Sequence, residues 1–158
     1  MFLAIDIGNT HSVFSFFDGN TQKAVWRLQS DAKRTADEYI AQLMPLAVKD
    51  GIQFGDVDNV WLSSVVPDAN NELKRLSRKL FDTDLVEISH ETLPQLSIKL
   101  PRPEEVGADR LVNAVAVMAY YKAPAIVIDF GTATTFDVVD HEGAFVGGVI
   151  APGVNLSV

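Results

Sequence analysis

The stretch LAIDIGNTHSVF, residues 3–14, decides the fold, because it joins two apolar strands through an acidic turn that contains a glycine. A closely related stretch, AIVIDFGTATTF, spans residues 125–136. When Asp6 is placed on Asp129, glycine falls on glycine two positions later and the flanking apolar residues agree. We therefore predict two copies of one strand–turn–strand unit, each followed by a third strand. The alternative is two unrelated turns, since Asp and Gly are common in turns.

The chemistry of these turns suits a phosphate ligand. Gly8 and Gly131 permit a close backbone approach, and consecutive backbone N–H groups can point at an anion. Neighbouring hydroxyls could add donors: Thr10, Ser12, Thr132, Thr134 and Thr135. A carboxylate at the strand end would repel phosphate unless it acts through a cation or a metal-bound water. The pattern predicts two turns that bind a nucleoside triphosphate, although neither matches the P-loop or the G-x-G-x-x-G motif.

Composition excludes several other classes of function. The chain has 158 residues, of which 47% are hydrophobic, enough for one domain and part of another. Its net charge of −8 argues against a nucleic-acid partner. No cysteine is present, which removes disulfides and thiolate metal sites. Asp6 interrupts the apolar start before it could form a signal peptide, and no stretch is long enough to span a membrane, so we expect a cytoplasmic protein.

Periodicity predicts the order β-β-β-α-β-α-β-α-β-β-β, with a proline-rich loop over residues 93–103 before the last helix. The expected strands cover residues 2–5, 12–17, 23–28, 59–66, 85–88, 125–128, 136–139 and 144–150. The expected helices follow a capping box at Thr35 up to Gly51 and cover residues 70–81 and 107–121, with Met44 and Met118 among the inward-facing residues. Strands that alternate with helices indicate an α/β fold with a mixed sheet.

A third acidic position lies in PEEVGADRLVNAV, residues 103–115, where a helix should begin. Asp109 could simply cap that helix, with Arg110 as a surface residue. Alternatively, a carboxylate here could accept the proton of a substrate hydroxyl, and the neighbouring guanidinium could bind an acidic substrate. We expect the remaining acidic residues Asp18, Asp137 and Asp140 to lie in turns and at strand ends.

Six blocks in this order resemble the type III pantothenate kinases: AIDIGNT, RTADEY, SSVVP, EEVGADRLVNAVA, DFGTATTFDVVD and GGVIAPG. The resemblance runs through the whole chain. It implies an α/β fold, in which a ribonuclease H-like, actin-like ATPase domain with a mixed sheet (residues 1–122) precedes the beginning of a second similar domain (residues 123–158). The activity it implies is ATP-dependent phosphorylation of pantothenate to 4′-phosphopantothenate, the first step of coenzyme A biosynthesis.

The resemblance also implies roles for individual residues. Asp109 would be the catalytic base, and the pantothenate site would comprise Gly107, Ala108, Asp109 and Arg110. Asp6 would lie near Mg²⁺, and Asp129 would hold a monovalent cation, K⁺ or NH₄⁺. The residues implied to bind ATP are Asp6, Ile7, Gly8, Asn9, Thr10, His11, Ser12, Val13 and Thr132.

Two features depart from the family pattern. Members often carry a tyrosine that contacts pantothenate where this chain has Leu100. The second copy starts near Ala125 and the sequence stops at Val158, so we expect the second domain to be incomplete, because a core of its own would need roughly 100 further residues. A full-length protein of this family would form a homodimer through that region.

Two other functions remain open at this point. The resemblance implies membership of the actin/hexokinase/Hsp70-like superfamily. The paired turns fit another small-molecule kinase or a phosphohydrolase of that superfamily equally well, although the GADR block does not. A non-catalytic regulatory or binding relative is the second alternative.

Overall fold

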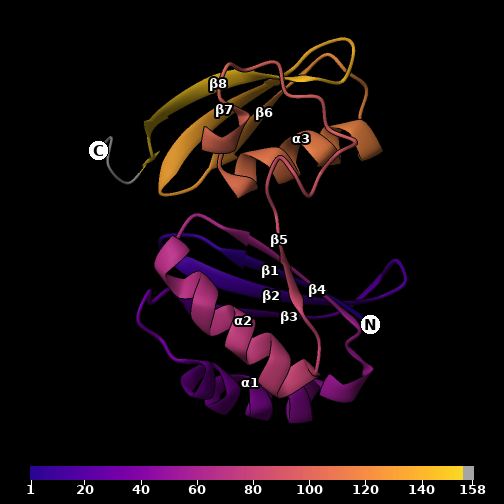
Figure 1. Cartoon of the computed structure of the whole chain (residues 1–158), viewed down its shortest axis with the longest axis vertical. Coiled ribbons are helices and arrows are strands. Elements are labelled where there is room, and N and C mark those ends of the chain that lie inside the picture. Colours follow the sequence, from indigo (N-terminus) through magenta and orange to yellow (C-terminus); the bar gives the residue numbers. More distant parts are fainter. Residues whose placement is uncertain (155–158) are drawn as a thin grey trace. The chain divides into compact units, whose positions relative to one another are not determined.

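The computed structural model describes residues 1–154, which form two compact units (Figure 1). The first unit runs from Met1 to Glu87, and the second begins at Ile88. Among the described residues, no helix is both long enough and apolar enough to cross a membrane. The last four residues of the predicted second domain, 155–158, lie outside the described part of the chain.

A five-stranded mixed sheet forms the centre of the first unit, with the strand order β3-β2-β1-β4-β5. Its strands are β1 (Phe2–Ile7), β2 (His11–Asp18), β3 (Thr21–Gln29), β4 (Asn59–Ser64) and β5 (Leu85–Glu87). β1 pairs antiparallel with β2 and parallel with β4. Parallel neighbours require crossover connections, which here contain the helices. The expected mixed sheet is confirmed.

Local sequence signals predict both ends of the first α-helix of this unit, whereas the second α-helix begins earlier than expected. The helices are α1 (Ala36–Asp50), the short η1 (Phe54–Asp56) and α2 (Pro67–Phe81). The Thr35 hydroxyl accepts the N–H of Glu38, and the Glu38 carboxylate accepts the N–H of Thr35, which completes the predicted capping box. Gly51 ends α1 with a φ of 70°, a conformation that favours glycine. Pro67 opens α2 three residues earlier than expected, because proline is well tolerated in the first helical turn.

The core of the first unit lies between the sheet and α1 and α2, which both cover the same face (Figure 1). On β1, Leu3, Ile5 and Ile7 point toward the helices and are at most 2% exposed. Leu43 of α1 is fully buried in the same cluster. Met44 is 47% exposed, so its predicted inward position is wrong. Successive residues are rotated by about 100° around the helix axis. Met44, the residue after the buried Leu43, therefore lies outside the buried stripe.

The second unit contains a three-stranded antiparallel sheet in the order β6-β7-β8. Its elements are η2 (Pro103–Glu105), α3 (Ala108–Tyr120), β6 (Ala125–Phe130), β7 (Ala133–Val139) and β8 (Phe145–Pro152). Residues 93–103 are mostly irregular, as predicted, apart from a bridge between Ile98 and Phe145. Met118 of α3 is 42% exposed, so its predicted inward position is also wrong.

The two sheets share a strand pattern but bury opposite faces. Ile126, Ile128 and Phe130 occupy the positions of Leu3, Ile5 and Ile7 in the repeat, yet they are 65%, 47% and 71% exposed. The face that α3 covers is the other one (Figure 1), where Asp137 lies opposite Gly148 and is fully buried. An alternating pattern therefore predicts a strand with one apolar face. It does not predict whether a helix of the described residues covers that face.

The expected domain division after residue 122 differs from the division into compact units. α3 lies before residue 122 in the sequence but packs on β6 and β7, so it belongs to the second unit. The unit boundary therefore falls between Glu87 and Ile88. The assignment of residues 1–122 and 123–158 to two related domains stays a prediction.

Replacing Ile5 with alanine is expected to lower the free energy of unfolding of the first unit by about 2–5 kcal/mol, because the change leaves a cavity in a closed core. Both tryptophans of the chain, Trp26 and Trp61, lie in this unit, so tryptophan fluorescence during urea unfolding reports on it. Val25→Ala is the control, since Val25 is 49% exposed on β3. It should cost less than about 1 kcal/mol. Equal losses for the two variants would contradict this description of the core.

Candidate active site

The first predicted phosphate turn joins β1 to β2 and is held by backbone and side-chain hydrogen bonds. The Gly8 N–H donates to the carbonyl of His11 at 3.0 Å. The Ser30 hydroxyl donates to the carbonyl of Gly8 at 2.6 Å, and the Ser30 N–H donates to the carbonyl of Thr10 at 2.9 Å. Ser30 therefore fixes the turn from the end of β3. The sequence carried no signal for this role, because the partners lie about 20 positions apart.

The side chains of the predicted ATP-binding residues divide between solvent and core. Asp6, Asn9, Thr10 and His11 are exposed. Val13 and Gly8 are half-buried. Ile7 and Ser12 are at most 1% exposed, and the Ser12 hydroxyl lies 3.0 Å from that of Ser30. The expectation that the Ser12 hydroxyl adds a phosphate donor is therefore wrong, because strand alternation turns it toward the core.

The second turn, between β6 and β7, is also shaped by close backbone contact. The Gly131 N–H donates to the carbonyl of Ala133 at 2.9 Å. A Cβ at Gly153 would lie 2.3 Å from the Thr132 carbonyl oxygen, so only glycine allows the chain after β8 to approach this turn. Asp129 and Thr132 are exposed, whereas Thr134 is 7% exposed. The Thr134 hydroxyl therefore does not serve as the surface donor that was expected.

The GADR block places its residues at the start of α3. Gly107 is the residue before the first helical turn, so the alternative in which Asp109 caps the helix is wrong. Ala108 is buried and Asp109 is half-buried. One Asp109 carboxylate oxygen accepts the N–H of Arg110 at 2.9 Å. The free N–H groups and the positive end of the helix dipole favour a carboxylate in this position.

Arg110 forms a buried ion pair rather than lying on the surface. Its Nε donates to the Asp137 carboxylate at 2.5 Å, with the two side chains 16% and 0% exposed. The surface interpretation of Arg110 is therefore wrong, and so is the expectation that Asp137 lies at a strand end. Asp137 is inside β7, opposite Val127 and Gly148. An acidic residue at an inward position of an apolar strand was the signal that could have revealed this pair.

Burial sets the protonation behaviour of this pair. The low-polarity surroundings raise the pKa of Asp137 above its ordinary value, although the Arg110 guanidinium opposes this effect.

Unlike Asp137, the other two acidic residues, Asp18 and Asp140, take the positions in turns and at strand ends that were expected. Asp18 ends β2, and Asp140 accepts the N–H groups of Glu142 and Ala144 in the β7–β8 turn.

A hollow of about 370 Å³ lies beside the start of α3 in the second unit. The residues that line it are Leu100, Pro101, Arg102, Glu105, Val106 and Arg110. Leu100, where the resemblance places the family's tyrosine, therefore lines the same hollow as Arg110, the predicted pantothenate-binding residue. All the residues that line this hollow belong to the second unit.

The loop that carries Leu100 is attached to the β7–β8 turn. The N–H of Lys99 donates to the carbonyl of Phe145 at 2.9 Å, and the N–H of Phe145 donates to the carbonyl of Ser97 at 2.8 Å. The Lys99 ammonium pairs with Asp140 at 2.7 Å and also with Glu142. These contacts fix the loop on the side of the hollow.

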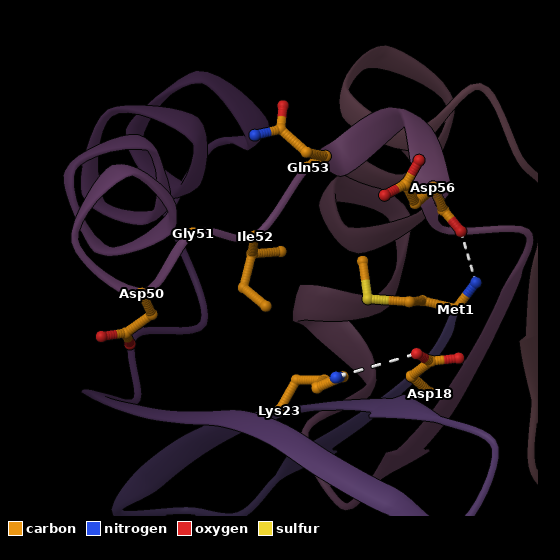
Figure 2. Close-up of a pocket in the computed structure, with 8 residues that line it drawn as sticks. All are labelled: Met1, Asp18, Lys23, Asp50, Gly51, Ile52, Gln53 and Asp56. Carbon is orange, nitrogen blue, oxygen red and sulfur yellow. Dashed lines mark hydrogen bonds and ion pairs between the residues drawn. The ribbon is translucent and has the colours of Figure 1, made fainter.

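A second hollow, of about 490 Å³, lies in the first unit (Figure 2). Its lining residues are Met1, Asp18, Lys23, Asp50, Gly51, Ile52, Gln53 and Asp56. None of the predicted ATP, pantothenate or metal residues is among them. It lies where β1 begins, whereas the phosphate turn follows the end of β1.

Residues 1–154 contain no group of three or more His, Cys, Asp or Glu side chains that could hold a metal ion by themselves. The predicted metal residues Asp6 and Asp129 are thus individual carboxylates at strand ends. Mg²⁺ is often bound by only one or two carboxylates, with water and substrate phosphates as its other ligands. The donors present therefore fit a metal that arrives with a nucleotide.

Comparison with solved structures identifies the fold. A propionate kinase from Francisella tularensis superimposes with a TM-score of 0.51 and 11% identity, covering 95% of this chain and 57% of that one. The ethanolamine utilization protein EutJ from Carboxydothermus hydrogenoformans gives a TM-score of 0.52 and 14% identity, covering 96% of this chain and 51% of that one. The chain has the α/β fold of the actin-like ATPases and their related kinases.

Sequence comparison then identifies the family. The family model for type III pantothenate kinase matches residues 2–158, so the chain belongs to that family. A type III pantothenate kinase of Paramagnetospirillum magneticum is 52% identical over 99% of this chain, and one of Rhodospirillum rubrum is 49% identical over 99%. The chain spans 61% and 62% of the length of these two relatives.

The ion pair between Lys99 and Asp140 can be tested by titration. Lys99 and backbone N–H groups lower the pKa of Asp140 from 3.8 to about 2. Because the folded value is the lower one, this stabilisation is present above about pH 4 and is lost as the pH falls toward 2. Lys99→Met should raise the pKa of Asp140 toward its ordinary value, as followed by NMR of the carboxyl carbon. Lys122→Met is the control, and an unchanged pKa in Lys99→Met would refute the pairing.

Proposed function

We propose that this protein transfers a phosphoryl group from ATP to pantothenate and produces 4′-phosphopantothenate, the first step of coenzyme A biosynthesis. The observation that carries this proposal is the family match across residues 2–158. Relatives that are 49–52% identical over nearly the whole chain are named type III pantothenate kinase. The substrates and activity of the whole protein are part of the proposal, since the chain spans about three fifths of those relatives.

ATP is proposed to bind at residues 6–13 and Thr132, where the buried Ser12 would take part through its backbone and not through its hydroxyl. Support comes from the exposed side chains of Asp6, Asn9 and Thr10 and from a turn that Ser30 fixes through two hydrogen bonds. Asp6 would hold Mg²⁺ together with the nucleotide phosphates, and Asp129 would hold K⁺ or NH₄⁺. When bound, these cations would offset negative charge on the transferred phosphoryl group.

Pantothenate is proposed to bind at Gly107, Ala108, Asp109 and Arg110. Asp109 would accept the proton of the attacking hydroxyl, which requires its carboxylate to be ionised and within hydrogen-bond reach. Its position in the first turn of α3 supports this role, because the helix dipole favours the anionic form there. Arg110 would bind the substrate carboxylate, and the adjacent hollow supports that assignment.

Some properties of the whole protein stay predictions. A homodimer, a cytoplasmic location and the absence of nucleic-acid and membrane partners are expected from the family resemblance and the acidic composition. The division into two related domains after residue 122 also belongs to this group.

The activity is tested by incubating the protein with pantothenate, ATP and Mg²⁺, with and without K⁺, and detecting 4′-phosphopantothenate by mass spectrometry. We expect product that depends on ATP and increases with K⁺. Asp109→Asn should lower turnover by about 10²–10⁴-fold, because the substitution removes the base but keeps its shape.

The control for this experiment is Asp68→Asn, since Asp68 is an exposed residue of α2 outside the proposed site. It should leave turnover unchanged. Near-normal turnover in Asp109→Asn would refute the general-base role. Product formation from another acid or sugar, but not from pantothenate, would favour a different kinase of the same superfamily, and nucleotide binding without turnover would favour a regulatory relative.

A further inference from the structure

The Arg110 guanidinium has a fixed position with unused hydrogen-bond donors. Its Nε donates to Asp137, while Nη2 is buried and makes no hydrogen bond to the described residues. A guanidinium carries five N–H donors, four of them on the two Nη atoms. One edge of the group is thus held by the protein, and because Nη2 is buried against β8, the N–H groups of Nη1 are the donors left to face a ligand.

Three neighbours define this orientation. Asp137 is fully buried in β7 and contacts the guanidinium at Nε. The aromatic ring of Phe145 lies 5.4 Å from the Arg110 Cζ, within the range of a cation–π contact. Nη2 lies close to the backbone of Gly148, where a Cβ would come within 2.5 Å of it and within 1.9 Å of the Phe136 carbonyl oxygen. The side chain is therefore held from β7 and β8 while it lines the hollow beside α3.

Asp137 itself is a poor candidate for direct contact with an acidic substrate. Its side chain has no exposed surface, and a carboxylate would repel the carboxylate of a ligand. A long arginine side chain is otherwise free to adopt many rotamers, and fixing it costs conformational entropy on binding. A buried partner that fixes the guanidinium in advance removes that cost.

We propose that Asp137 is a positioning residue for substrate binding, which holds Arg110 through Nε so that its remaining donors meet the substrate carboxylate. This inference rests on the proposed function. It assigns a role in substrate recognition to a residue that does not touch the substrate.

The test compares two ligands by calorimetry on the whole protein: pantothenate, and the neutral alcohol in which a hydroxymethyl group replaces its carboxylate. Asp137→Ala should raise the Kd of pantothenate by about tenfold or more, the effect of losing one well-oriented charge-assisted hydrogen bond. The Kd of the neutral alcohol should change less than twofold. Asp137→Asn, which keeps an acceptor oxygen for Nε, should recover most of the affinity for pantothenate.

A purely structural role would weaken both ligands together, and that result would overturn the proposal. Unchanged or tighter pantothenate binding in Asp137→Ala would also overturn it, because Asp137 would then only compete for the charge of Arg110. If the alanine variant does not fold, as judged by circular dichroism, Asp137→Thr replaces it, since a β-branched residue suits a strand. Wild-type protein that binds neither ligand would refute the proposed function instead.

Discussion

The buried ion pair between Arg110 and Asp137 is the constraint on which the second unit depends. It connects the first turn of α3 to the middle strand of a small sheet, and both side chains are largely removed from water. Removing one partner of such a pair leaves a charge buried alone, at a cost of about 3–5 kcal/mol. The same contact fixes the side chain that lines the hollow, so stability and the candidate substrate site are linked through one interaction.

The internal repeat gives the two units the same strands but different surroundings. In the first unit, α1 and α2 cover the apolar face of β1, and β4 extends the sheet beyond it. In the second unit, α3 covers the opposite face, and the residues equivalent to the buried ones of β1 are exposed in the described structure. One strand–turn–strand pattern therefore supports two packing arrangements, and the turn that is predicted to bind phosphate keeps the same sequence features in both.

The sequence was sufficient to predict the element order, the mixed sheet and the start of α1. Those features depend on local signals: alternation, the Thr35 capping box and the positive φ of Gly51. The partners of distant residues could not be predicted, because they depend on how strands and helices pack. Two examples are Ser30, which hydrogen-bonds to the first turn, and Asp137, which pairs with Arg110. Both hold residues that the motifs had identified. Met44 and Met118 show the limit of periodicity, since apolar residues also occur beside the buried stripe of a helix.

The central claim is that the start of α3 binds the acid that is phosphorylated. A crystal structure of the protein with pantothenate and a non-hydrolysable ATP analogue tests it most directly. We expect the pantothenate carboxylate on the Arg110 guanidinium and its primary hydroxyl within about 3.2 Å of the Asp109 carboxylate, the reach that proton transfer requires. Pantothenate bound away from both residues, with its hydroxyl beyond the reach of Asp109, would contradict the account.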